Sequence, residues 1–271
     1  MKLVIELKDK DASELIMAWV STHEPEAVVE NESSLEVYLL DEKYDLLRET
    51  LINNTSLEHS QISTVVVQQK NWNAEWEANF KPISVGDLYI RAPFHPAIPK
   101  YKNELIIAPK MAFGTGHHET TFMMLESMKE MNLNGLTVLD YGCGTGILTV
   151  YSKLCGCGSI TGIDIQEEAI ENTYEHFELN KISTEDLTVK LGDLDQIWGE
   201  KYDLVLANIN RQVLLQNADN LISHINKGGT LLMSGILKAD REIITKRYAE
   251  AGFVSKGAKI KGEWCCFAYG K

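Results

Sequence analysis

The chain has 271 residues, of which 44% are hydrophobic and 24% charged, and its formal net charge is −13. This length accommodates one large domain or two smaller ones, each with its own core. The acidic balance argues against a general nucleic-acid binder, which needs a basic surface for phosphate groups, but it suits a basic protein substrate attracted over long range.

The first 70 residues predict the order strand, helix, strand, strand, helix, strand. Alternating or β-branched segments indicate four strands, at Lys2–Leu7, Ala27–Val29, Leu35–Leu40 and Ile62–Gln68. Apolar residues at helical spacing indicate two helices, at Ala12–Val20 and Tyr44–Ile52. This order is that of a ferredoxin-like split βαβ fold. We therefore expect a small α+β domain at residues 1–70.

A connector is predicted at residues 71–104. Trp72, Trp76 and Phe80 recur every four residues, which indicates a short amphipathic helix whose rings pack onto a domain. Short strands are expected to follow it between residues 83 and 91, before a proline-rich stretch interrupts regular structure.

From Leu105 to Lys271, short apolar strands alternate with helices. Five strands are predicted at Val138–Asp140, Ser159–Asp164, Thr188–Leu191, Leu204–Ala207 and Thr230–Met233. The helices are predicted at Leu148–Leu154, Glu167–Leu179, Val213–Ile222 and Arg241–Ala251. Such alternation predicts a parallel sheet covered on both faces. The last two strands, Val254–Ile260 and Trp264–Tyr269, have only a short turn between them, so an antiparallel hairpin should complete a seven-stranded, Rossmann-like α/β domain at residues 105–271.

A glycine-rich turn, Gly142-Cys143-Gly144-Thr145-Gly146, follows the first strand of this second domain. Glycines allow a tight bend and the close approach of a ligand to the backbone. In open parallel sheets, ligands bind outside the carboxyl ends of the strands. The next strand ends at Asp164, about 20 residues further on, where an acid in such folds binds ribose hydroxyls. The turn and the acid together predict a nucleotide-type cofactor.

The spacing of the glycines indicates which cofactor binds. Ile147 stands where the dinucleotide pattern G-x-G-x-x-G has its third glycine. Asp140 precedes the turn, and a carboxylate there is a poor neighbour for a pyrophosphate but suits an ammonium and a sulfonium group. The chemistry therefore favours S-adenosylmethionine, with an NAD-dependent oxidoreductase as the alternative.

No metal site is expected. His117, His118 and Glu119 are adjacent on a loop and lack the H-E-x-x-H spacing that places two ligands on one helical face. The loop Gly114–Thr121 is better interpreted as a flexible lid over the cofactor, with its glycines as hinges.

Cysteine usage and the absence of export signals indicate the compartment. The five cysteines are too few and too clustered for a secreted disulfide framework, which indicates a reducing environment. The start of the chain lacks the apolar core of a signal peptide, and no apolar run approaches the roughly 20 residues of a membrane span. We expect a cytoplasmic protein without a membrane partner.

Two segments carry a resemblance to known families. Val138–Leu148 resembles the first motif of class I S-adenosylmethionine-dependent methyltransferases, whose last strand is likewise antiparallel. Ala112–Thr121 is similar to the segment that marks ribosomal protein L11 methyltransferases. Shorter similarities extend the resemblance over nearly the whole chain, at Ala207–Ile209, Ser234–Leu237, Glu263–Cys265 and the connector.

The resemblance implies cofactor contacts at Thr121, Gly142, Asp164 and Asn208, and it makes Asn208 the candidate catalytic residue. Methylation requires a neutral amine, whereas a free lysine has a pKa of about 10.4. The side-chain carbonyl of Asn208 can accept the amine's hydrogens and orient its lone pair. Asn210, at the next outward position, is a candidate second amine contact.

The predicted function is a protein methyltransferase acting on lysine side-chain amines of ribosomal protein L11, with the N-terminal amine as a further candidate. The resemblance implies that the N-terminal domain binds the substrate and that the connector lets the catalytic domain reorient. We expect a monomer without direct nucleic-acid contact. Another protein or a small-molecule amine is the alternative substrate. A non-catalytic RNA-binding module is disfavoured because residues 1–70 lack aromatic-rich, basic strands.

Overall fold

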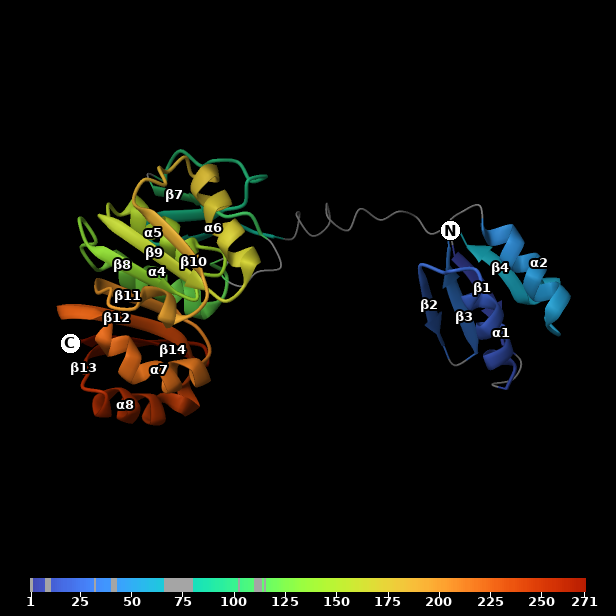
Figure 1. Cartoon of the computed structure of the whole chain (residues 1–271). Coiled ribbons are helices and arrows are strands. Elements are labelled where there is room, and N and C mark those ends of the chain that lie inside the picture. Colours follow the sequence, from blue (N-terminus) through green and yellow to red (C-terminus); the bar gives the residue numbers. More distant parts are fainter. Residues whose placement is uncertain are drawn as a thin grey trace. The chain divides into compact units, whose positions relative to one another are not determined.

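The computed structural model describes residues 2–7, 11–31, 33–39, 43–65, 80–101, 103–109, 114 and 116–271. The chain divides into two compact units, Met1–Trp76 and Glu77–Lys271 (Figure 1). The predicted helix through Trp72 and Trp76 lies outside the described residues. Among the described helices, none combines the length and the apolar character that crossing a membrane requires.

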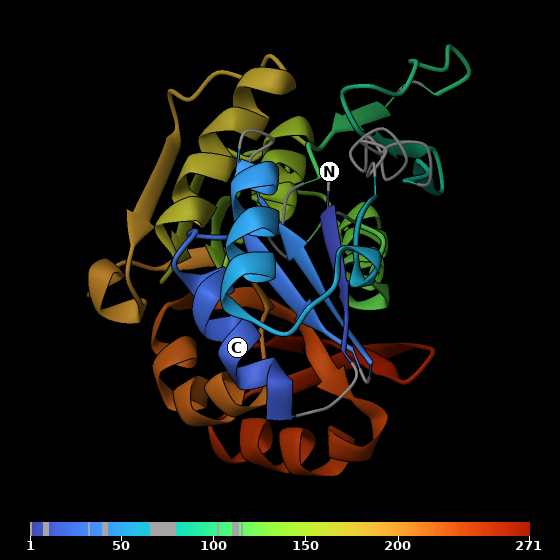
Figure 2. The ribbon, with the colours of Figure 1, turned by 90° about the vertical axis from the view of Figure 1, so that its right-hand side faces the viewer.

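The N-terminal unit is a four-stranded antiparallel sheet with helices on one face (Figures 1 and 2). Its strands are β1 (Lys2–Glu6), β2 (Ala27–Glu30), β3 (Ser34–Tyr38) and β4 (Ile62–Val65), in the order β2-β3-β1-β4. Its helices are α1 (Asp11–Ser21), α2 (Tyr44–Asn54) and the 3-10 turn η2 (His59–Gln61). Alternate residues of β1, Leu3 and Ile5, are buried with Leu47 of α2, so one face of the sheet carries the core.

A small three-stranded sheet opens the second unit. It contains β5 (Ile83–Val85), β6 (Leu88–Arg91) and β7 (Asn103–Ile106), and β7 lies parallel to β6. The side chain of Asn180 binds β7 in the manner of a neighbouring strand: its Oδ1 accepts from the Ile106 N–H at 2.8 Å, and its Nδ2 donates to the Ile106 carbonyl at 2.7 Å. These two hydrogen bonds attach the small sheet to the rest of the unit.

The second unit is built on a seven-stranded sheet in the order β10-β9-β8-β11-β12-β14-β13. Its strands are β8 (Thr137–Tyr141), β9 (Ser159–Asp164), β10 (Leu187–Leu191), β11 (Tyr202–Asn208), β12 (Ile225–Leu237), β13 (Val254–Lys261) and β14 (Trp264–Gly270). The first five are parallel, while β14 is antiparallel to both of its neighbours. The predicted mostly parallel sheet and its terminal hairpin are therefore confirmed.

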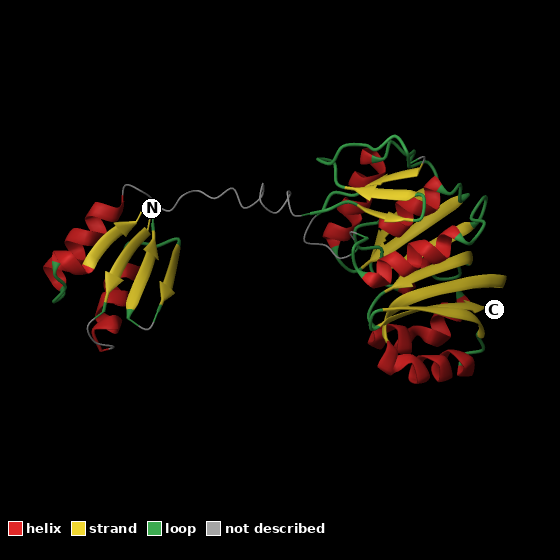
Figure 3. Cartoon of the chain, turned by 180° about the vertical axis from the view of Figure 1, so that it is seen from behind, coloured by secondary structure: helices red, strands yellow, loops and turns green. Residues whose placement is uncertain are grey.

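Helices cover both faces of this sheet (Figure 3). They are α4 (Glu119–Lys129), α5 (Ile147–Leu154), α6 (Glu167–Leu179), α7 (Arg211–Ser223) and α8 (Arg241–Glu250), with the 3-10 turns η3 (Leu194–Ile197) and η4 (Lys238–Asp240). Consecutive strand residues point to opposite faces, so Val138 packs in the core with α4, α5 and α6, whereas Leu139 packs in the core with α7 and α8. This arrangement leaves the carboxyl ends of the parallel strands free of covering helices.

Strand β12 is longer than the predicted Thr230–Met233 segment. It begins at Ile225 and continues through Gly228 and Gly229. Because glycine is depleted in strands, the sequence pattern did not indicate a strand over these residues. Its register is interrupted between Met233 and Ile236, where Gly235 has a φ of +89°. A Cβ atom on Gly235 would lie 2.1 Å from the Ile209 carbonyl oxygen, so the glycine lets the loop after β11 approach this strand.

Candidate active site

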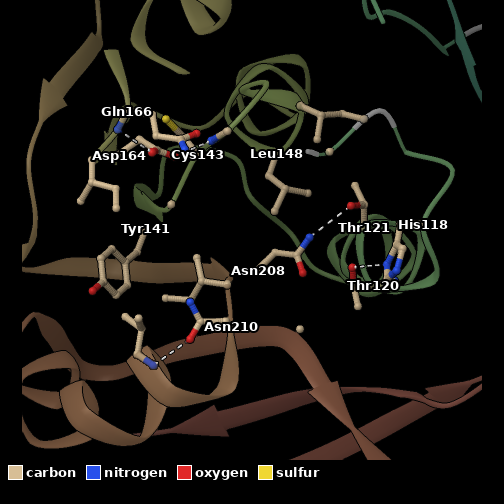
Figure 4. A pocket seen from close by; sticks show the side chains of 18 of the residues that line it. His118, Thr120, Thr121, Tyr141, Cys143, Leu148, Asp164, Gln166, Asn208 and Asn210 are labelled. Carbon is tan, nitrogen blue, oxygen red and sulfur yellow. Dashed lines mark hydrogen bonds between the residues drawn. The ribbon is translucent and has the colours of Figure 1, made fainter. Parts of the chain in front are cut away.

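A cavity of about 540 Å³ lies at the carboxyl ends of β8, β9, β10 and β11 (Figure 4). β9 and β11 flank β8 on opposite sides, so this is the topological switch point at which open α/β sheets bind ligands. All four residues predicted to contact a cofactor, Thr121, Gly142, Asp164 and Asn208, line the cavity. The fold thus brings together side chains from α4, the glycine turn, and the ends of two strands.

The glycine turn forms one wall, and its conformation requires glycine. Gly142 has a φ of +75°, and a Cβ atom there would lie 2.2 Å from Cγ2 of Ile209. Gly146, with a φ of +74°, is the N-cap of α5, and its Cβ would lie 2.9 Å from the Cα of Thr173. The turn therefore adopts left-handed conformations in a space that excludes side chains, which lets a ligand lie against the backbone.

Asp164 ends β9 with its carboxylate fixed by the backbone. Its Oδ2 accepts from the Gly144 N–H at 2.9 Å, and its Oδ1 accepts from the Gln166 N–H at 3.0 Å (Figure 4). Each carboxylate oxygen can accept a further hydrogen bond. Since both oxygens are held in place while retaining that capacity, the group is suited to bind a vicinal diol.

Asn208 ends β11 and presents its side-chain oxygen to the cavity. Its Nδ2 donates to Oγ1 of Thr121 at 3.1 Å, and in Figure 4 the oxygen points away from this bond. Asn208 Oδ1 is buried and has no hydrogen-bond partner in the described part of the chain. Leaving such a carbonyl unsatisfied costs about 1–3 kcal/mol. The site is thus prepared to receive a hydrogen-bond donor at this atom.

Asp140, two residues before Gly142, is a second buried acceptor. Thr149 donates to its Oδ2 at 2.6 Å, whereas Oδ1 has no partner among the described residues. Burial raises the pKa of this carboxyl from 3.8 to about 7, and the negative charge of Asp164 adds to the rise. Asp140 itself does not line the cavity, whose wall begins with the next two residues, Tyr141 and Gly142.

The two histidines of the loop before α4 have structural contacts. His118 is the N-cap of α4, with Nδ1 accepting from the Thr120 N–H at 3.3 Å, and its ring meets the Trp264 ring edge-on at 4.9 Å. His117 Nε2 lies 2.6 Å from the carbonyl oxygen of Lys81. His118 and Trp264 line the cavity, so this part of the wall is aromatic.

Asn210 also lines the cavity, but its side-chain oxygen is used elsewhere. It is the N-cap of α7, and Oδ1 accepts from the Val213 N–H at 3.1 Å (Figure 4). The amide oxygen has two acceptor sites, so one of them is available to a ligand. The second amine contact at Asn210 stays a prediction.

Three further residues of the wall were missed from the sequence: Tyr141, Asp193 and Trp264. Asp193 follows β10 closely, just as Asp164 ends β9, so the same strand-end reasoning would have found it. Tyr141 is the last residue of β8 and directly precedes the glycine turn. Trp264 reaches the cavity from the start of β14, a position that only the folded sheet determines.

Comparisons with known proteins agree with this arrangement. The family model for "Ribosomal protein L11 methyltransferase (PrmA)" matches residues 3–271. A ribosomal protein L11 methyltransferase from Porphyromonas gingivalis is 42% identical over 212 residues, covering 77% of this chain and 72% of the relative. One from Phocaeicola vulgatus is 35% identical over 251 residues, covering 90% of this chain and 88% of the relative.

A solved structure has a similar fold. The crystal structure of ribosomal protein L11 methylase from Lactobacillus delbrueckii subsp. bulgaricus superposes with a TM-score of 0.65 at 28% sequence identity. The match covers 71% of this chain and 99% of that structure.

Proposed function

Because the chain belongs to the ribosomal protein L11 methyltransferase family, we propose that it transfers methyl groups from S-adenosylmethionine to lysine side-chain amines of ribosomal protein L11. The observation that carries the chemistry is the buried, unpartnered Oδ1 of Asn208 in the cavity wall. Family membership removes the NAD-dependent oxidoreductase alternative. The N-terminal amine of the substrate is a second candidate acceptor.

The residues of the cavity fit S-adenosylmethionine. When bound, the cofactor supplies a methyl group on a positively charged sulfur, open to attack by a nucleophile. Asp164 would bind the ribose diol, and Gly142 would let the amino-acid end lie against the backbone. Asp140 precedes the glycine turn, and a positive charge on a ligand bound there would favour its ionised form, against the burial that raises its pKa to about 7.

Asn208 would act on the amine that receives the methyl group. Its Oδ1 accepts an amine hydrogen, which directs the nitrogen lone pair and stabilises the positive charge that develops on nitrogen. Thr121 is a positioning residue, because its hydroxyl holds Nδ2 and so fixes which end of the amide faces the cavity. Removing the lysine from water favours its neutral form, which lowers the barrier to attack.

The aromatic wall would bind the remainder of the substrate side chain. Trp264 and His118 line the same cavity as Asn208 and contact each other ring to ring. A tryptophan face accommodates both the aliphatic stem of a lysine and a cationic head group. This supports lysine as the acceptor.

We infer that residues 1–70 form a ferredoxin-like domain that recognises L11. The element order β1-α1-β2-β3-α2-β4 and the sheet order β2-β3-β1-β4 support this assignment. Residues 1–76 contain 15 of the 39 acidic side chains but 6 of the 26 basic ones, so this unit would attract a basic ribosomal protein. Residues 71–104 would connect this domain to a catalytic domain at residues 105–271. Strands β5 and β6, which lie within residues 71–104, belong to the same compact unit as residues 105–271. We propose a monomeric enzyme that acts in the cytoplasm.

Incubation of the full-length protein with methyl-labelled S-adenosylmethionine and recombinant L11 tests the proposal. We expect label on L11, located on lysine side chains by mass spectrometry, and strongly reduced labelling with Asn208→Ala. If the protein binds S-adenosylhomocysteine yet leaves L11 unlabelled, the substrate assignment is wrong. Label confined to the N-terminal amine would contradict the lysine assignment alone.

A further inference from the structure

Helix α6 presents a line of polar side chains to the interior of the second unit. Thr173, His176 and the C-cap residue Asn180 lie three and four positions apart, and therefore on one side of the helix. Thr173 contacts the glycine turn, with its Oγ1 3.6 Å from Sγ of Cys143. Asn180 binds the backbone of Ile106 in β7. His176 lies between them and is fully buried, where a polar group is costly unless it is hydrogen-bonded.

His176 joins two segments that are distant in the sequence. Its Nε2 accepts from the Ala108 N–H at 2.8 Å, so this nitrogen carries a lone pair. Its Nδ1 lies 2.6 Å from the Thr145 carbonyl oxygen, which can only accept, so Nδ1 carries the hydrogen and donates it. Together the two contacts fix one neutral tautomer of the imidazole. One nitrogen thus holds the glycine turn, and the other holds the chain that continues from β7.

Thr145 extends this bridge to the cavity wall. It lies fully buried in the glycine turn, and its hydroxyl donates to the Gly114 carbonyl at 2.8 Å. Gly114 lines the cavity, as does Thr121 further along the same segment. The glycine turn is therefore fixed on one side by His176, and on the other side it fixes the segment that leads to Thr121.

The bridge connects the two walls between which the methyl group has to move. The glycine turn is the wall for the cofactor, whereas Thr121 holds Nδ2 of Asn208, whose Oδ1 faces the amine. The alignment of methyl donor and acceptor depends on how these walls are placed relative to one another. A misplacement of about 1 Å at a reacting centre can cost on the order of 100-fold in rate.

We propose that His176 is a positioning residue for methyl transfer, whose two ring nitrogens set the glycine turn against the chain that leads to Thr121 and Asn208. This inference rests on the proposed function, because it assumes a cofactor at the turn and an amine at Asn208. The Nδ1 contact governs cofactor affinity, since it holds the turn. The Nε2 contact governs the rate of transfer, since it holds the chain that carries the acceptor wall.

Two substitutions separate these contacts. An asparagine amide lies about as far from the backbone as Nδ1 of histidine, so His176→Asn can still donate to Thr145 but does not reach Ala108. A glutamine amide lies about as far out as Nε2, so His176→Gln can still accept from Ala108 but leaves the Thr145 carbonyl unpaired. Each variant thus keeps one contact and removes the other.

The experiment combines calorimetric titration of the full-length proteins with S-adenosylhomocysteine and single-turnover methyl transfer to L11 at saturating cofactor. We expect His176→Asn to keep the dissociation constant within about twofold and to slow transfer by about fivefold or more. We expect His176→Gln to weaken binding by about fivefold or more, with the smaller loss of rate.

His224 offers a matched control. It is also buried, at 2% exposure, and its Nδ1 lies 2.9 Å from the Glu200 carbonyl oxygen. It is the C-cap of α7, its carbonyl accepts from the first residue of β11, Tyr202, and it does not line the cavity. His224→Asn and His224→Gln should leave both the dissociation constant and the transfer rate unchanged, whatever their effect on the urea midpoint.

Thr145→Val provides a second test that leaves the histidine in place. It removes the hydroxyl bond to Gly114, whereas Thr145→Ser retains it. Valine should slow transfer and serine should restore it. If neither His176 variant folds, an unchanged rate in Thr145→Val overturns the proposal.

Two results with the folded His176 variants would overturn the inference while leaving the proposed function intact. In the first, both variants lower the urea midpoint but change neither the dissociation constant nor the rate, which is the signature of a purely structural role. In the second, asparagine and glutamine change both parameters equally, so that the two nitrogens have no separate tasks. Failure of the unmodified protein to bind S-adenosylhomocysteine or to methylate L11 would refute the proposed function and the inference together.

Discussion

Exchange of Asn208 for alanine removes the acceptor that the structure presents to an incoming amine. Oδ1 of Asn208 is buried and unpartnered in the described part of the chain. A hydrogen bond from the amine therefore replaces no earlier hydrogen bond of this atom within the protein. As the amine attacks, positive charge develops on nitrogen, and a hydrogen bond to a charged group contributes about 1.5–3 kcal/mol. At 1.36 kcal/mol per tenfold, Asn208→Ala should lower kcat by roughly 10- to 150-fold.

The affinity for S-adenosylhomocysteine should change little, because Asp164 and the glycine turn are untouched. The assay is single-turnover methyl transfer to L11 for the rate, with calorimetric titration for the dissociation constant. A kcat within about twofold of the unmodified protein would refute the assigned role, as would a rate loss fully explained by weaker cofactor binding.

Thr121 completes this test through a double-mutant cycle. Thr121→Val removes the hydroxyl that binds Asn208 Nδ2, whereas Thr121→Ser retains it. If Thr121 acts only by orienting Asn208, the valine variant should slow transfer by itself but cause no further loss in the Asn208→Ala background. Additive losses would show that Thr121 contributes through a separate contact.

Three other changes have defined outcomes. Asp164→Ala should weaken S-adenosylhomocysteine binding by about 1–3 kcal/mol in calorimetric titration, since two hydrogen bonds are lost, whereas unchanged affinity would mean that Asp164 does not bind the ribose. Gly142→Ala places a Cβ 2.2 Å from Cγ2 of Ile209 at a positive φ, so urea unfolding should show a loss of about 1–3 kcal/mol; unaltered stability would contradict the steric account. Asp140 keeps its proton in the folded protein up to about pH 7, while the unfolded chain loses it near 3.8, so stability falls as pH rises through this interval. Asp140→Asn should flatten the fall in the urea midpoint between about pH 4.5 and pH 7, and an unaltered slope would assign the effect to another group.

Much of the catalytic unit could be predicted because its signals are local. A parallel strand buried on both faces is a short apolar run, and the residue that follows it lies at the carboxyl edge of the sheet. This reasoning brought Gly142 and Asp164 to one edge of the sheet, and the family resemblance added Asn208. The same reasoning applied to β10 would have found Asp193. The left-handed conformation of the turn likewise follows from glycine at alternate positions.

Other features depended on partners distant in the sequence. The side chain of Asn180 hydrogen-bonds to strand β7, and the glycine-containing strand β12 pairs with β11 and β14. These long-range contacts leave no periodic pattern of apolar residues in the sequence. Asn208 and Asn210 are the same residue type two positions apart, yet the oxygen of one is free and that of the other caps α7. The sequence by itself determined which residues reach the edge of the sheet, because strand and turn formation depend on neighbouring residues. Only the tertiary structure decided which of their polar atoms remain available, because hydrogen-bond partners are supplied by segments that meet only in the folded chain.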